Sequence, residues 1–384
     1  MIWSRQGKRK QNLMASAALA LSLCAPAAAR AEFKNPVDCS NPKSLEPGGI
    51  VGKGPNGEAA VGPDSLALSP AEAEKVKAGH FKVGLVFHFM NDWSRDQIAG
   101  LTATFDKYGV KIIGTTEAEF KVPKQIADIE NMITLKPDGI VTIPVDDVAM
   151  GPSYAKVAKA GIKMVFMDNV GKGLTYPNDY QSLISADSQG NGQIAAKILS
   201  CYLPENATMG IVDFGITFFV TNERTKGVKD WFAANRPDVK IKQANFTDPN
   251  KAGDVAANFL TANPDVKGIF AVWDGPAMGV ISALRVQGKV VPVTTIDLGD
   301  QASVEIARGT YLKGLGAQRP YDQGVAEALA MMNALIGKTP AAWIGVPSLA
   351  VEQSNINEAY KIVWKKDAPK ETAAACADSG KCDK

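Results

Sequence analysis

From residue 81 onward, short apolar runs alternate with longer segments in which apolar residues recur every three or four positions. Val122, Ile126, Ile129 and Ile133, for example, are spaced four, three and four apart, which places one apolar stripe along a helix. The pattern predicts strands at 82–87, 110–114, 139–144 and 163–167, separated by helices at 95–107, 122–135 and 147–159.

The same alternation restarts after Asp187. It predicts strands at 208–213, 239–246, 268–272 and 292–296, and helices at 189–202, 222–234, 250–263 and 277–287. Strands that alternate with helices through short turns form parallel sheets covered on both faces. Two successive sets predict an α/β protein with two doubly wound, Rossmann-like lobes. One closed barrel is the alternative, but the break at 175–190, rich in Tyr, Pro, Asn and Asp, favours a hinge crossing.

The N-terminal residues 1–31 have the pattern of a secretory signal peptide. Basic residues at 5–10 precede an apolar stretch at 13–25, and Ala29-Arg30-Ala31 offers small residues for cleavage near Ala31. The apolar stretch is too short for a stable membrane anchor. We therefore expect a periplasmic protein, which excludes most nucleotide-dependent chemistry. Lipidation at Cys24 is an alternative, although Leu23 precedes it where a small residue is required.

Charge and cysteine content narrow the class further. Without residues 1–31, the chain holds 37 Lys and Arg against 40 Asp and Glu, which gives no reason to expect a nucleic-acid partner. Cys39, Cys201, Cys376 and Cys382 form an even set in an exported chain and predict disulfides, with three pairings open. With only two histidines and no zinc-type cysteine spacing, we expect no metal and no cofactor.

The two ends of the chain outside the alternating pattern differ in composition. Residues 32–80 comprise an arm, rich in Gly, Pro, Asn and Asp at 33–65, and a short helix that Ser69 can cap ahead of Pro70. We expect the arm to lie on the domain surface, with Cys39 as its candidate anchor. Residues 366–384 are a Lys-, Asp- and Gly-rich C-terminal tail, in which Cys376 and Cys382 are close enough to close a small loop.

Candidate binding residues follow the predicted strands, because doubly wound sheets bind ligands at the carboxyl ends of their strands. These positions hold carboxylates, amides and aromatic rings, which suit an uncharged polyhydroxylated ligand. Asp146 and Asp147 fit better as caps of the following helix. The predicted ligand-binding residues are His88, Asn91, Trp93, Asp168, Asn222, Phe246, Trp273, Asp297 and Gln318.

Several segments resemble the periplasmic sugar-binding proteins of ABC transporters, of the ribose- and galactose-binding type. Gln125–Glu130 leads through Pro137–Val141 to Pro144-Val145-Asp146, and Ile184–Asp187 is followed by Gly190 and Gly192. Asn263–Ala271 then leads to Asp274 and to Ala277-Met278-Gly279. Their order and spacing carry the resemblance over about residues 81–352.

The resemblance implies two lobes joined by three crossing segments near residues 186, 318 and 346, closing over one sugar. Lobe 1 would comprise 81–186 and 319–345, and lobe 2 would comprise 187–318 and 346–365. We expect a monomeric binding protein, not an enzyme, with a membrane permease as its partner; a binding protein that serves mainly chemoreception, with a chemoreceptor as its partner, is an alternative. The resemblance also implies that Asp168 accepts hydrogen bonds from sugar hydroxyls and that Asp297 and Gln318 contact the ligand near the hinge. Asn91 and Trp93 would supply the polar and stacking positions after the first strand, and Phe246 would form an aromatic wall.

Three departures from the ribose-type pattern put ribose itself in doubt. Asn222 stands where an arginine is usual, Ser94 replaces a second ring, and Trp273 replaces an asparagine. We expect a pocket that has lost a cation and gained a ring, and therefore a different sugar, a polyol, a cyclic derivative or an amine-bearing ligand. A carbohydrate hydrolase using Asp168 and Asp297 is the leading alternative, although the chain has no Gly-x-Ser-x-Gly elbow, P-loop or dinucleotide fingerprint.

Overall fold

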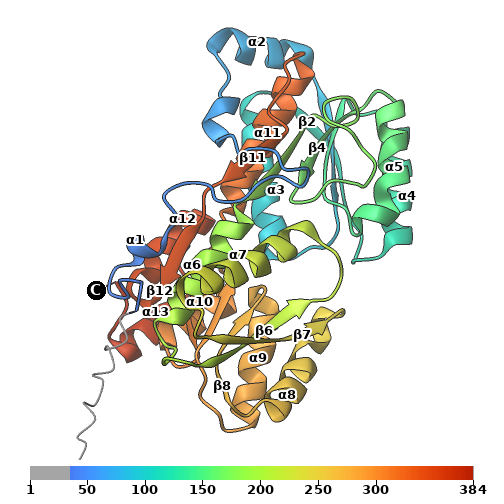
Figure 1. Cartoon of the computed structure of the whole chain (residues 1–384). Coiled ribbons are helices and arrows are strands. Elements are labelled where there is room, and N and C mark those ends of the chain that lie inside the picture. Colours follow the sequence, from blue (N-terminus) through green and yellow to red (C-terminus); the bar gives the residue numbers. More distant parts are fainter. Residues whose placement is uncertain (1–34, 384) are drawn as a thin grey trace, which may run out of the picture. The chain divides into compact units, whose positions relative to one another are not determined.

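A computed structural model describes residues 35–383, which form two α/β lobes (Figure 1). The sheet of lobe 1 has six parallel strands in the order β11-β5-β4-β3-β1-β2. The strands are β1 (Lys82–Phe87), β2 (Lys111–Glu117), β3 (Gly139–Thr142), β4 (Lys163–Met167), β5 (Ser182–Ala186) and β11 (Trp343–Val346).

The sheet of lobe 2 repeats this order as β12-β10-β9-β8-β6-β7, and only β12 runs antiparallel to its neighbour. The strands are β6 (Thr208–Phe214), β7 (Lys240–Phe246), β8 (Val266–Ala271), β9 (Val293–Ile296), β10 (Leu312–Ala317) and β12 (Leu349–Glu352). The chain passes between the two sheets three times, after β5, after β10 and after β11.

Helices cover both faces of each sheet. Those of lobe 1 are α2 (Pro70–Gly79), α3 (Asp92–Lys107), α4 (Val122–Thr134), α5 (Asp147–Lys159) and α11 (Pro320–Leu335). Those of lobe 2 are α6 (Ser188–Ser200), α7 (Phe219–Asn235), α8 (Ala252–Ala262), α9 (Asp274–Val286), α10 (Asp300–Arg308), α12 (Ile356–Trp364) and α13 (Lys370–Ser379). Short helical turns are α1 (Pro42–Leu45), η1 (Pro63–Leu66), η2 (Pro249–Lys251) and η3 (Gln353–Asn355).

Alternation along β1 shows why lobe 1 needs helices on both sides. Val83, Leu85 and Phe87 pack in one core cluster with residues of α3 and α11. Val86 packs in another cluster with residues of α4 and α5. Because successive side chains of a strand point to opposite faces, a strand apolar at both positions must be buried on both faces. This confirms the predicted doubly wound lobes and excludes a single barrel.

Two elements of the structure were not predicted from the pattern. The break at 175–190 contains β5, whose five residues are all buried, and the chain leaves lobe 1 after Ala186. The C-terminal tail contains α13, which packs on α10 through a 2.7 Å hydrogen bond between Thr372 and Ser303.

Local signals at both ends behave as the sequence predicts. Ser69 and Glu72 form a reciprocal capping box at the start of α2. Disulfides join Cys39 to Cys201 and Cys376 to Cys382. No helix within residues 35–383 is long and apolar enough to cross a membrane. The predicted signal peptide, its cleavage near Ala31 and Cys24 lie outside the described residues.

Helices α3 and α11 approach so closely that glycine is required at their contact. A Cβ atom on Gly324 would lie 2.2 Å from the carbonyl oxygen of Gln97, and one on Gly100 would lie 2.2 Å from that of Tyr321. Since a backbone carbonyl cannot yield as the end of a side chain can, any larger residue must separate the two helices.

We therefore expect Gly324→Ala to lower the free energy of unfolding by about 1–3 kcal/mol through overpacking. Urea denaturation followed by circular dichroism measures this loss. Gly48→Ala is the matched control, because no atom lies within 4 Å of the added methyl group. Equal midpoints for the two variants would show that the helices are free to separate.

Candidate ligand-binding site

A cavity of about 290 Å³ opens between the connections that follow the strands of both sheets. Lobe 1 contributes the β1–α3 connection, lobe 2 contributes the connections after β8 and β9, and the crossing after β10 and the end of α12 complete the wall. The lining residues are Phe89, Asn91, Asp92, Trp93, Trp273, Asp274, Gly275, Asp297, Leu298, Gly299, Gln318, Pro320, Val363 and Trp364.

Five of the nine predicted ligand-binding residues line this cavity: Asn91, Trp93, Trp273, Asp297 and Gln318. Two of them also define the start of a helix. Asn91 caps α3 by accepting from the backbone N–H of Ser94 at 3.0 Å, and Trp273 is the residue immediately before α9. Ser94, which replaces the ring expected from the resemblance, is buried in that capping box. The connections therefore have rigid helix starts that hold Trp93 and Trp273 at the cavity.

A buried arginine forms an ion pair with Asp297, one of the residues that line the cavity. Arg224 of α7 is 4 % exposed and donates to the Asp297 carboxylate at 3.1 Å and to the Val272 carbonyl at 3.1 Å. The Gln318 amide donates to the other Asp297 oxygen at 2.7 Å. Charge-assisted bonds of this kind are stronger than neutral ones and fix geometry. Residues from α7, β9 and the crossing after β10 are thus joined at one carboxylate.

Arg224 bears on the expectation that the pocket has lost a cation. That expectation rested on Asn222; the arginine two positions later is buried beside Asp297 and is not among the residues that line the cavity. Thr221, Arg224, Thr225 and Val228 are all buried on α7 at the i, i+3, i+4, i+7 spacing of an inward helix face. A charged residue within such a stripe is the sequence signal that would have found it.

Two further carboxylates lie near this pair. Asp168, directly after β4, is 4 % exposed and accepts a 3.3 Å hydrogen bond from Gln323. Its pKa is raised to about 7, mainly by burial and also by the charge of Asp297, against the opposing effect of Arg224. Burial and the Asp297 charge likewise raise the pKa of Asp274 to about 7. Asp274 accepts from the backbone N–H groups of Gly275 and Gly299 at 2.8 and 2.9 Å.

His88 lies beside the cavity in an aromatic cluster rather than in its lining. Its ring is stacked on Phe218 at 6.4 Å and meets Phe120 and Trp93 edge to face at 4.9 and 5.9 Å. Burial lowers the pKa of His88 to about 3, so its imidazole is neutral near pH 7. Phe218 belongs to the loop before α7, so this cluster joins the two lobes, as does a 2.8 Å bond from the Phe219 N–H to the Asn169 side chain.

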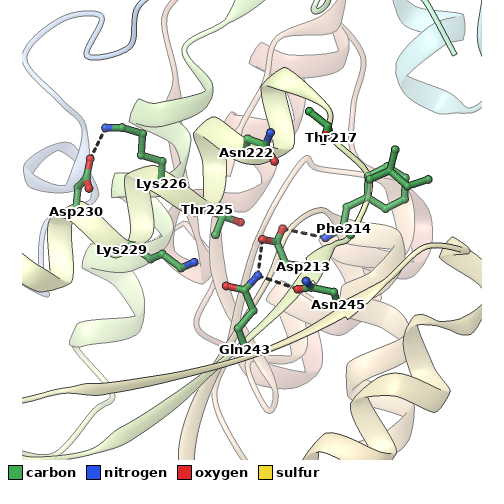
Figure 2. Close-up of a pocket in the computed structure, with 12 residues that line it drawn as sticks. Asp213, Phe214, Thr217, Asn222, Thr225, Lys226, Lys229, Asp230, Gln243 and Asn245 are labelled. Atoms are coloured by element: carbon green, nitrogen blue, oxygen red, sulfur yellow. Dashed lines mark hydrogen bonds and ion pairs between the residues drawn. The ribbon is translucent and has the colours of Figure 1, made fainter. Parts of the chain in front are cut away.

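The structure does not bring Asn222 and Phe246 to the cavity. Asn222 is exposed and lines a separate groove of about 430 Å³ beside Asp213, Gln243 and Asn245 (Figure 2). Phe246 is 2 % exposed and packs against Trp273 with ring centroids 5.3 Å apart. It supports the cavity wall from behind.

Other lining residues were not among the nine predicted residues. Phe89 and Asp274 follow strands, so the strand-end rule that found their neighbours applies to them as well. Val363 and Trp364 lie at the end of α12, a helix that the pattern analysis did not predict. The Trp364 indole donates to the Leu298 carbonyl at 2.6 Å, which fixes its ring at the cavity edge.

Comparison with known proteins agrees with this arrangement. A family model described as a periplasmic binding protein domain matches residues 83–339. The ribose import binding protein of Bacillus subtilis is 25% identical over 248 residues, which cover 65% of this chain and 79% of the relative. The chain belongs to the periplasmic binding protein family, and its similarities are to sugar-binding proteins of the ribose type.

Two solved structures share the fold at lower identity. A solute-binding protein of an ABC transporter from Agrobacterium vitis, bound with α-D-tagatopyranose, is 21% identical with a TM-score of 0.68, covering 74% of this chain and 100% of that one. Another from Mycobacterium smegmatis, with bound glycerol, is 22% identical with a TM-score of 0.67, covering 76% of this chain and 99% of that one.

The raised pKa of Asp168 gives a prediction about stability. Between about pH 4 and pH 7 the folded protein holds a proton on Asp168 that the unfolded chain releases, so this group's contribution to stability falls as pH rises through that window. Asp168→Asn removes the titration. We expect the variant to gain about 1–3 kcal/mol relative to wild type between pH 5 and pH 8.

Thermal unfolding at the two pH values measures this difference. Asp64→Asn, at an exposed carboxylate of η1, should change little between them. If the effect of Asp168→Asn is the same at pH 5 and pH 8, the carboxyl of Asp168 does not titrate in this window.

Proposed function

We propose that this protein is the exported substrate-binding protein of an ABC importer, that it binds a sugar or polyol in the cavity between its lobes, and that it delivers the ligand to a membrane permease. The observation that carries the proposal is the lining of that cavity. Trp93 of lobe 1 and Trp273 of lobe 2 supply flat apolar faces, and Asp297 and Gln318 supply hydrogen-bonding groups between them.

This lining suits a ring or chain that carries hydroxyl groups on an apolar carbon framework. Carboxylate and amide oxygens accept from hydroxyls, while aromatic rings cover C–H faces. Ribose, tagatopyranose and glycerol, the compounds named for the relatives above, are all neutral polyhydroxylated molecules. Similarity to proteins of such different ligands supports the class of ligand but not one compound.

The charges around the cavity narrow the class of ligand. Asp168, Asp274 and Asp297 surround a single guanidinium, that of Arg224, and Arg224 is already paired with Asp297. An anionic ligand such as a sugar phosphate or sugar acid would meet the Asp297 carboxylate and the acidic side chains of Asp92 and Asp274, with no Lys or Arg among the residues that line the cavity. Neutral ligands are favoured, and an amine-bearing polyol is compatible with the same carboxylates.

The way the cavity is assembled supports capture by closure. Because its walls come from two lobes, a ligand can touch all of them only in one lobe arrangement, and it stabilises that arrangement by its differential affinity. His88, Asp168, Asn222 and Phe246 complete the proposed site as surrounding residues. Asn222 would join the ligand contacts only through movement of α7.

A non-catalytic role fits the positions of Asp168 and Asp297. A hydrolase that used these two residues as its acid and nucleophile would present both carboxyl groups to the ligand. Asp297 lines the cavity, whereas Asp168 is buried and is not among the lining residues. Binding without turnover is therefore the proposed activity, whether the loaded protein meets the permease or a chemoreceptor.

Calorimetric titration with neutral pentoses, hexoses and alditols, chosen by a thermal-shift screen, tests the proposal. We expect at least one ligand with micromolar or tighter affinity, recovered chemically unchanged. Asp297→Asn and Trp273→Leu should each weaken it by about 10- to 100-fold, as expected for loss of a buried charged hydrogen bond or a stacking face.

Asp265→Asn is the matched control. It removes an exposed carboxylate, paired with Lys242, at the start of β8 and therefore at the opposite edge of the same sheet. Conversion of the ligand into a product would contradict the binding-only role. Equal affinities for all three variants would place the site elsewhere.

A further inference from the structure

The segment from Asn35 to Leu66, which we call the arm, contacts both lobes and the first of the three connections between them. Figure 1 shows it in blue, running from α1, which contacts β12, toward η1, which contacts α11. We propose that the arm is a strap that limits how far the two lobes move relative to each other. This device is additional to the proposed binding function.

One end of the arm is fixed to lobe 2. Cys39 is bonded to Cys201 directly after α6, and the Asn35 amide donates to the Ser200 carbonyl at 2.8 Å. Leu45 of α1 is fully buried in a cluster with Ile194 and Ile198 of α6. A covalent bond and a buried side chain together anchor this end.

The middle of the arm is bonded to the first crossing. Asp187 directly follows β5, and its carboxylate accepts from the backbone N–H groups of Val51 and Gly52 at 2.7 and 2.9 Å. The same carboxylate caps α6 by accepting from the Gly190 N–H at 3.0 Å. One buried side chain therefore joins the arm, the crossing and the first helix of lobe 2.

The strand after the third crossing is bonded to the arm, and the crossing itself is bonded to Asp187. The Glu46 carboxylate accepts from the Ala350 N–H of β12 at 3.3 Å, and Ser348 donates to the Asp187 carbonyl at 3.0 Å. The first and third crossings are thereby linked to each other and to the arm.

The other end of the arm is fixed to lobe 1. Val61 forms a parallel bridge with Ile344 at the β11 edge, donating to the Trp343 carbonyl at 3.3 Å and accepting from Gly345 at 3.1 Å. Leu66, at the end of η1, is 2 % exposed, and its carbonyl accepts from Asn333 of α11 at 2.9 Å.

These contacts give the arm a mechanical role. A hinge motion needs backbone rotation within a few connecting residues. Here the first of the three connections is hydrogen-bonded to a segment whose two ends are attached to different lobes, and the third connection is hydrogen-bonded to the first. Rotation must either carry the arm along or break its hydrogen bonds to Asp187 or the bridge from Val61 to β11. Lobe arrangements that break those contacts are disfavoured, so the arm narrows the range of arrangements.

The test compares distances between the lobes in the ligand-free full-length protein, so it does not depend on the identity of the ligand. Spectroscopic labels on non-natural amino acids at Lys159 of α5 and Lys267 of β8, both exposed, report the distance distribution. Hydrogen exchange at residues 51 and 52 reports whether the arm is attached.

Two variants release the anchors. Cys39→Ser with Cys201→Ser removes the covalent anchor, and adding Val61→Pro removes the N–H donor of the bridge. The matched control, Cys376→Ser with Cys382→Ser, removes a disulfide of six-residue separation that does not involve the arm.

We expect faster exchange at residues 51 and 52 and a broader distance distribution in the released variants, with neither change in the control. An unchanged distribution despite fast exchange would overturn the proposal, because the arm would be free and the lobes unaffected. Slow exchange in the variant that lacks both anchors would also overturn it, because these anchors would then not hold the arm.

Discussion

The ion pair between Arg224 and Asp297 is the interaction on which the candidate site depends. A guanidinium that is 4 % exposed must have its charge compensated, since an unpaired buried charge is severely destabilising. Asp297 supplies that compensation, and Gln318 and the Val272 carbonyl complete the hydrogen bonds. The helix α7, the ends of β8 and β9, and a crossing between the lobes are therefore held at one point.

Sheet topology explains why this point lies where a ligand can reach it. Both sheets are mainly parallel and have the same strand order, so the connections after their strands emerge at the carboxyl edges. Helix starts such as Asn91 before α3 and Trp273 before α9 fix the side chains there. The same connections that position the aromatic rings thus also supply the walls of the cavity from both lobes.

Much of the fold follows from hydrophobic periodicity, and the strand-end rule found Trp93, Trp273, Asp297 and Gln318. Tertiary relations were harder to predict. Arg224 was not predicted because the resemblance drew attention to Asn222 alone, whereas Arg224 is marked only by its place in the buried stripe of α7. Phe246 also lies at the end of a strand, but its ring packs behind Trp273 and does not line the cavity. Side-chain packing decides whether a ring lies in front of or behind the cavity wall, and the spacing of residues along the sequence does not encode that packing.

Chemical shifts of the tryptophan indole N–H groups during titration with a neutral sugar or polyol test the central claim most directly. The account predicts that Trp93 and Trp273, which line the cavity, shift with the added ligand, while the core residues Trp231 and Trp343 do not. Saturable binding that leaves the Trp93 and Trp273 signals unchanged would contradict it, because the ligand would then occupy a site other than the cavity between the lobes.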